Sequence, residues 1–215
     1  MDEKILRSCA DCGVTACQKP LGTGEYPAFC LTEHMDPQVK AEALAAYEEP
    51  ENHKIMTTAA EVEYEGYCRW PRVQEIMEFA RRMGYRRLGI ATCVGLIRET
   101  RILAGILRSN GFAVYGVACK AGAVPKTEAG IDGKCMELGP NMCNPILQAK
   151  LLNEAKTELN IVVGLCVGHD SLFYKYSEAI VTTLVTKDRV TGHNPVAALY
   201  TAESYYKGLY GSEKA

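Results

Sequence analysis

The stretch that decides the fold is LGIATCVG at residues 88–95, an apolar run that stops at a cysteine with a glycine close behind it. The same pattern returns in YGVACKAG at residues 115–122 and in IVVGLCVG at residues 161–168. Each run is typical of a buried strand that leads into a turn or helix. In an open parallel sheet the carboxyl ends of the strands open on one crevice, where ligands bind. We therefore expect the cysteines of the three runs to meet at one edge of a sheet: Cys93, Cys119 and Cys166.

Helix signals between these strands set the fold class. The expected order is strand 87–92, helix 95–109, strand 112–118, helix 145 to about 159, strand 160–165, a short helix from Asp170 and strand 180–186. This alternation predicts an α/β fold with an open, mainly parallel sheet of about four strands and helices on both faces. A final helix is expected after Pro195, with its tyrosines in core or dimer contacts: Tyr200, Tyr205, Tyr206 and Tyr210.

Three segments differ in character along the chain. Residues 1–34 are rich in Cys, Gly and Pro and indicate a metal-binding module built from loops. Residues 35–85 predict helices that pack on the core, and residues 86–215 predict the α/β domain with the cysteine-lined crevice. The glycine-rich stretch 120–143 predicts a long loop of functional or mobile kind.

Composition narrows the class of protein. The 215 residues carry a net charge of −2, which gives no electrostatic case for a nucleic acid or an anionic membrane as partner. No apolar stretch is long enough to span a bilayer, and the first residues lack a signal-peptide pattern, so we expect a cytoplasmic protein. Ten cysteines in a reducing compartment favour metal binding or thiol chemistry over disulfides.

The clearest local motif lies near the N-terminus. Four cysteines follow the spacing C-x2-C-x4-C-x12-C, which suits four thiolates around one tetrahedral ion: Cys9, Cys12, Cys17 and Cys30. Such a site stabilises a segment that has little core of its own. Zinc and an iron–sulfur cluster both fit four thiolates, and His34 stays open as a replacement for one of them.

Two more cysteines join the three at the strand ends as candidate cofactor ligands. Cys68 and Cys143 each precede a predicted helix, where the helix dipole favours a thiolate. Three polar residues are candidate catalytic groups that would orient an anionic substrate or move protons: Lys120, His169 and Lys187. Cys135, within the long loop, receives no role.

Nucleotide-binding glycine motifs, His-Glu-x-x-His and Gly-x-Ser-x-Gly are all missing from the sequence. The leading hypothesis is a metal-binding protein with an iron–sulfur cluster in the crevice, used for redox or sulfur-transfer chemistry, and a zinc or second cluster in the N-terminal module. One alternative is a zinc-stabilised thiol enzyme with Cys119 or Cys166 as nucleophile. Another is a non-catalytic metal carrier or sensor. The expected partner is a small molecule or an electron-transfer protein, and a homo-oligomer stays open.

Several segments also resemble the DUF1847 family. They are MCNPILQA at residues 142–149, GLCVGHDSLF at 164–173, Lys187-Asp188-Arg189 and GHNP at 192–195. With the Cys9-x2-Cys12 motif and the Cys93 and Cys119 segments, the resemblance covers nearly the whole chain. It implies a metal-binding protein of archaea and anaerobic bacteria, and it names no reaction and no catalytic residue.

Overall fold

The computed structural model describes residues 7–20 and 22–211. Its contacts divide the chain into two units, Met1–Thr57 and Thr58–Ala215. The helices and strands, in chain order, are α1 (Leu31–His34), α2 (Pro37–Ala46), α3 (Pro50–Gly66), α4 (Arg72–Met83), β1 (Arg87–Thr92), α5 (Ile97–Ser109), β2 (Ala113–Ala118), α6 (Pro145–Glu154), β3 (Leu159–Val163), α7 (His169–Tyr176), β4 (Ile180–Val185) and α8 (Val196–Tyr200).

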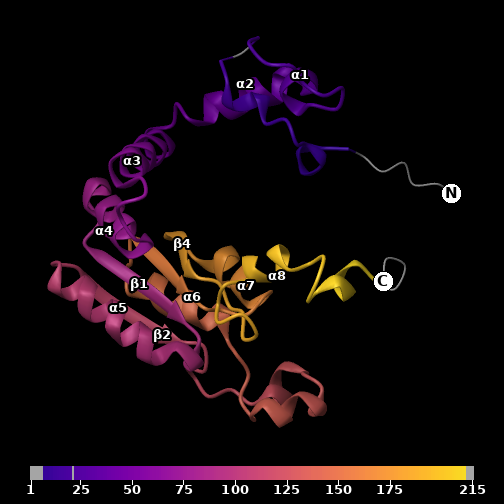
Figure 1. Ribbon diagram of the computed structural model, residues 1–215. Coiled ribbons are helices and arrows are strands. Elements are labelled where there is room, and N and C mark those ends of the chain that lie inside the picture. Colours follow the sequence, from indigo (N-terminus) through magenta and orange to yellow (C-terminus); the bar gives the residue numbers. More distant parts are fainter. Residues whose placement is uncertain (1–6, 21, 212–215) are drawn as a thin grey trace. The chain divides into compact units, whose positions relative to one another are not determined.

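The second unit is built on a four-stranded sheet with the order β2-β1-β3-β4, in which every pairing is parallel (Figure 1). Helices α5, α6 and α7 connect successive strands, which is the arrangement that parallel strands require. The predicted α/β class, with an open parallel sheet, is confirmed.

Alternation along the strands divides the core into two layers. Leu88 and Ile90 of β1 pack with Ile76 of α4 and Leu103 of α5 on one face. On the other face, Ala91 and the neighbouring strands pack against α6 and α7, which contribute Ala149, Leu152 and Phe173. Helices therefore cover both faces of the sheet (Figure 1). Helix α4, which lies within the segment 35–85 that the sequence predicts to pack on the core, contributes Ile76 and Ala80 to the first of these layers.

Helix α6 ends five residues earlier than the sequence suggests, at Glu154 rather than near residue 159. Lys156 adopts a left-handed backbone conformation with φ 53°, which stops the helix. The Glu158 backbone N–H then donates to the Arg87 carbonyl at 2.8 Å, and Leu159 opens β3. The carboxylate of Glu158 also accepts the backbone N–H groups of Arg86 and Arg87, so tertiary contacts place this boundary.

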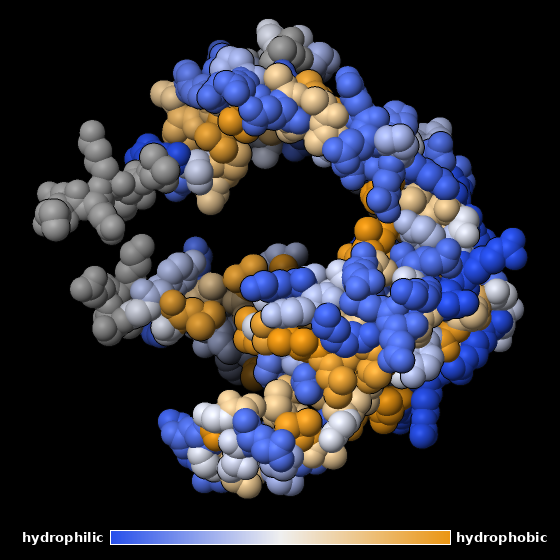
Figure 2. Space-filling view, turned by 180° about the vertical axis from the view of Figure 1, so that it is seen from behind, coloured by the Kyte–Doolittle hydropathy of each residue, from blue (hydrophilic) through white to orange (hydrophobic). Residues whose placement is uncertain are grey.

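The C-terminal segment also differs from the expectation. Helix α8 has five residues, and turns and a short 3-10 helix (Lys207–Tyr210) follow it. Tyr200 and Tyr205 are 82% and 92% exposed, so they are not core residues. Figure 2 shows hydrophobic residues, in orange, exposed on the surface of the molecule. Within the described chain, no helix combines the length and apolar character needed to cross a membrane.

Candidate metal centre

The carboxyl ends of β1 and β2 place two thiols on neighbouring strands. Thr92 is the register partner of both Ala118 on β2 and Val163 on β3. The ladder continues one residue further, because the Cys93 N–H donates to the Val163 carbonyl at 3.0 Å and the Cys119 N–H donates to the Thr92 carbonyl at 2.8 Å. Both cysteines are buried, and both face the layer formed by α6 and α7.

The start of α6 brings a third thiol to the same place. Asn144 caps this helix, since its side chain accepts the Leu147 N–H at 3.0 Å. The Asn144 backbone N–H donates to the Cys119 carbonyl at 2.8 Å, which fixes the preceding residue, Cys143, beside β2. Cys143 is half-buried and packs against the cluster that contains Cys93 and Cys119.

These three side chains form the strand-end thiol cluster: Cys93, Cys119 and Cys143. Hydrogen bonding with Cys119 lowers the pKa of Cys93 and of Cys143 to about 5, against the opposing effect of burial. Sharing its proton with Cys143 and Cys93 raises the pKa of Cys119, and burial raises it further. Of the three thiols, Cys119 therefore holds its proton most tightly.

Backbone N–H groups of the turn after β1 also point at the cluster. The Gly95 N–H donates to the Cys93 sulfur at 3.4 Å, and the Val94 N–H donates to the Cys119 sulfur at 3.3 Å. Such bonds favour negatively charged sulfur, which is the form that binds metal.

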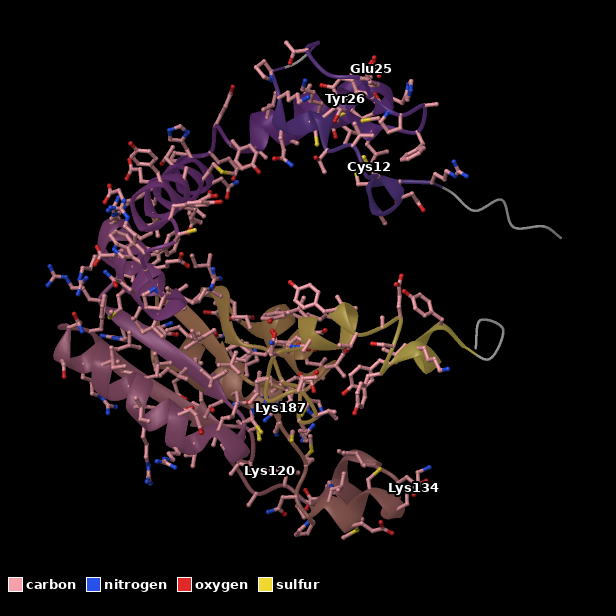
Figure 3. The ribbon with its side chains drawn as sticks, in the orientation of Figure 1. Cys12, Glu25, Tyr26, Lys120, Lys134 and Lys187 are labelled. Atoms are coloured by element: carbon pink, nitrogen blue, oxygen red, sulfur yellow. The ribbon has the colours of Figure 1, made fainter. Side chains whose placement is uncertain are left out.

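Cationic side chains surround the thiolates. Lys187, which follows β4, lies against Cys93 and helps to lower its pKa, while Lys120 and His169 do the same for Cys143. In Figure 3 sulfur atoms lie between the labelled Lys120 and Lys187. The Lys120 ammonium also donates to the Asn141 carbonyl at 2.5 Å, which ties the long loop to the end of β2. The structure thus brings the three candidate catalytic residues to the thiols.

Cys166 reaches this region with a different partner. The Arg189 guanidinium donates to the Cys166 sulfur at 3.1 Å. Arg189 is held in a closed turn, because the Asp188 carboxylate accepts the N–H groups of Val190 and Thr191 at 2.9 and 3.0 Å. His193 secures the same turn, accepting the Asp188 N–H on Nδ1 at 3.1 Å. The sequence places Lys187-Asp188-Arg189 after the last strand, at the crevice edge, but no sequence pattern indicates that Arg189 donates to Cys166.

Two other cysteines have different surroundings. Cys68 is exposed, with φ 55° in the turn after α3, and it is not part of the buried layer that contains the three clustered thiols. Cys135 is half-buried on a 3-10 helix of the long loop, where its carbonyl accepts a hydrogen bond from the buried Lys126 ammonium.

The N-terminal cysteines lie in short helical turns or directly beside them. Cys9 and Cys17 are exposed, whereas Cys12 and Cys30 are half-buried. Hydrogen bonds from the backbone N–H groups of Thr15 and Val14 lower the pKa of Cys12. Figure 3 marks Cys12 in this unit. His34 ends α1, four residues after Cys30.

Across residues 7–20 and 22–211, no three Cys, His, Asp or Glu side chains stand in an arrangement that would hold one metal ion.

Comparison with known proteins gives one family and distant structural likenesses. Residues 30–184 match the family described as "Protein of unknown function (DUF1847)". An uncharacterized protein of Methanocaldococcus jannaschii is 47% identical over 167 residues, which cover 77% of this chain and 85% of the relative.

Two crystal structures of Dph2 from Pyrococcus horikoshii, one with a 4Fe-4S cluster, align with TM-scores of 0.35 and 0.34 at 16% and 20% identity. Each alignment covers 65% of this chain, which spans about a third of the length of Dph2. The family match and the identity to the Methanocaldococcus jannaschii protein show that the chain belongs to the DUF1847 family.

Proposed function

We propose that this protein binds an iron–sulfur cluster at the carboxyl ends of its parallel strands. The observation that carries the proposal is the meeting of Cys93, Cys119 and Cys143 from β1, β2 and the start of α6. Three distant segments supply sulfur to one point, and cysteine sulfur is the usual ligand of such clusters. Two of these thiols are already thiolates near neutral pH, as metal binding requires.

The charge around the cluster also suits this cofactor. Thiolate-ligated iron–sulfur centres carry net negative charge, which nearby cations stabilise. Lys187, Lys120 and Arg189 supply that charge from two different loops. We expect the thiol side chains to reorient on metal binding, because Cys119 must lose the proton that it now shares with its neighbours.

The chemistry of the centre would depend on whether Cys166 is a fourth ligand of the cluster. A cluster held by four cysteines would transfer electrons, whereas one held by three would leave an iron open for Lewis-acid or sulfur-transfer chemistry. In the structure the sulfur of Cys166 accepts a hydrogen bond from Arg189, which favours a cluster held by three cysteines. Lys120, His169 and Lys187 would then orient a small anionic substrate or move protons.

We also propose a structural metal, zinc or a second cluster, in the N-terminal module. Among the buried hydrophobic side chains of the described chain, Ala16 alone falls within residues 7–57. A unit with so little apolar burial needs another source of stability. Cys9, Cys12, Cys17 and Cys30 provide four sulfurs over a short stretch, and the N–H groups that point at Cys12 favour its thiolate.

A thiol enzyme without metal in the crevice is the second candidate. The low pKa of Cys143, together with its partial exposure, makes it the best nucleophile of the strand-end thiol cluster. Cys119 is a poor choice because it is buried and keeps its proton. All ten cysteines are free thiols, which supports a reducing, cytoplasmic setting for either function.

Anaerobic reconstitution with ferrous iron and sulfide tests the proposal. We expect the full chain to retain iron and acid-labile sulfide, and Cys119→Ala to lose most of the crevice iron. Cys135→Ser is the matched control, since Cys135 lies outside the strand-end thiol cluster, and it should keep the wild-type content. Equal iron in Cys119→Ala and Cys135→Ser would rule the crevice site out.

A further inference from the structure

Gln148 is a fully buried polar residue next to the strand-end thiol cluster. It lies on α6 and is 0% exposed. Its Nε2 donates to the Val117 carbonyl at 2.7 Å and to the Thr92 carbonyl at 3.1 Å. Within the described chain its amide oxygen is buried with no hydrogen-bond partner.

The two carbonyls belong to the strand ends that carry the thiols. Thr92 directly precedes Cys93, and its carbonyl also accepts the Cys119 N–H at 2.8 Å. Val117 lies two residues before Cys119 on β2. Gln148 itself stands on the helix that begins just after Cys143. One amide nitrogen therefore links the three backbone segments from which the clustered sulfurs project.

Burial of this amide has a cost that a hydrophobic residue would avoid. A buried carbonyl oxygen without a partner loses its bonds to water, whereas Met or Leu would fill similar space without that loss. The strands are already hydrogen-bonded to each other through their ladders, so the sheet does not need Gln148 to form. The role left for the side chain is to fix the position of α6 against the ends of β1 and β2.

We infer that Gln148 is a positioning residue of the strand-end thiol cluster, which sets the spacing of Cys93, Cys119 and Cys143 for metal binding. This inference rests on the proposed function, because it assumes that the three sulfurs act together. Groups that orient metal ligands from behind commonly change metal affinity when they are replaced. Loss of the Gln148 amide would let the three segments move independently, and the sulfurs would bind a shared ligand less tightly.

Substitutions at Gln148 in the full-length chain test this role. Gln148→Met removes both hydrogen bonds at similar size, while a protonated Glu in Gln148→Glu retains one donor. The matched control is Thr157→Val, which removes the buried bonds of Thr157 to the Leu152 carbonyl and to Asn160 beyond the other end of α6. Phenylarsine oxide, which bridges two thiols, is the probe in metal-free protein, with peptide mapping to locate the bridge. The reduction potential of the iron-loaded protein is the second readout.

We expect Gln148→Met to weaken arsenical binding at the strand-end thiol cluster by about 10- to 100-fold. The arsenical affinity of Gln148→Glu should lie between those of Gln148→Met and the wild type. Thr157→Val should bind the arsenical with the wild-type affinity. The reduction potential should shift in Gln148→Met and stay constant in Thr157→Val. Circular dichroism establishes whether each variant is folded. If Gln148→Met is unfolded, the same measurements on Gln148→Glu are compared with those on Thr157→Val.

If folded Gln148→Met, or Gln148→Glu in its place, binds the arsenical as tightly as Thr157→Val does, the inference is overturned. The proposed function fails separately, if the wild type takes up no iron and sulfide. Weakened arsenical binding in Gln148→Met would then still support a positioning role toward the thiols themselves.

Discussion

Proton sharing among Cys93, Cys119 and Cys143 determines the chemistry available at the residue scale. The central thiol stays protonated while its two neighbours ionise, with pKa values of about 5. Only Cys143 of these two is open enough to react with a reagent in solution, since Cys93 is 8% exposed. The metal-free protein should therefore contain one reactive and one protected thiolate.

Replacement of Cys119 should change the pH dependence of Cys143. In metal-free wild type, alkylation of Cys143 should be nearly independent of pH between about pH 6 and pH 8, because its thiolate is already formed. Cys119→Ala removes the hydrogen bond that contributes most to the lowered pKa, so alkylation should keep rising through pH 8. Iodoacetamide labelling with peptide mass spectrometry measures this, and identical profiles in both proteins would contradict the proton assignment.

Arg189 and Gln148 show what the sequence could not supply at this scale. The strand-end cysteines were predictable, because a parallel sheet brings the ends of its strands to one edge. The partner of Cys166 depends on a turn closed by Asp188 and His193, and the contacts of Gln148 depend on how α6 lies across two strands. Such tertiary geometry leaves no local sequence pattern.

At the element scale, Gly89 allows β1 to pack closely against Asn160 of β3. A Cβ at Gly89 would lie 2.0 Å from the Asn160 side-chain oxygen, which is buried and accepts from Thr157. Gly89 thus leaves room for a polar group inside the sheet layer. The strands and most helices were predictable from apolar runs and caps, but the end of α6 was not, because Lys156 and Glu158 stop it through a turn and tertiary contacts.

Addition of one methyl group at Gly89 should destabilise the sheet. We expect Gly89→Ala to lower the free energy of unfolding by about 1–3 kcal/mol through overpacking against Asn160. Gly116→Ala on β2 is the matched control, since the nearest atom to its added Cβ is 3.9 Å away. Urea unfolding compares the two variants, and an equal loss of stability in both would show that the close approach is not the cause.

At the scale of the whole molecule, the two units are stabilised in different ways. The second unit has two apolar layers on a parallel sheet. Within the described residues of the first unit, Ala16 is the one buried hydrophobic residue, so the fold of that unit should depend on metal. The sequence indicated this difference through cysteine spacing and the lack of apolar periodicity in residues 1–34.

Removal of metal should therefore loosen one unit and spare the other. Chelation should increase proteolytic cleavage within residues 9–30 at least about tenfold, because the ligated state loses its main source of stability. Cys12→Ser should act like the chelator, and Cys135→Ser should not. Limited proteolysis followed by mass spectrometry gives the cleavage sites, and resistance of residues 9–30 after chelation would argue against a structural metal there.

Iron-edge anomalous diffraction from anaerobically grown crystals tests the central claim most directly. The account predicts an anomalous peak at the carboxyl edge of the sheet, in bonding contact with the sulfurs of Cys93, Cys119 and Cys143. A map with no iron there, in which Cys119 still lies hydrogen-bonded between its two neighbours in a protein that has taken up iron, would contradict it.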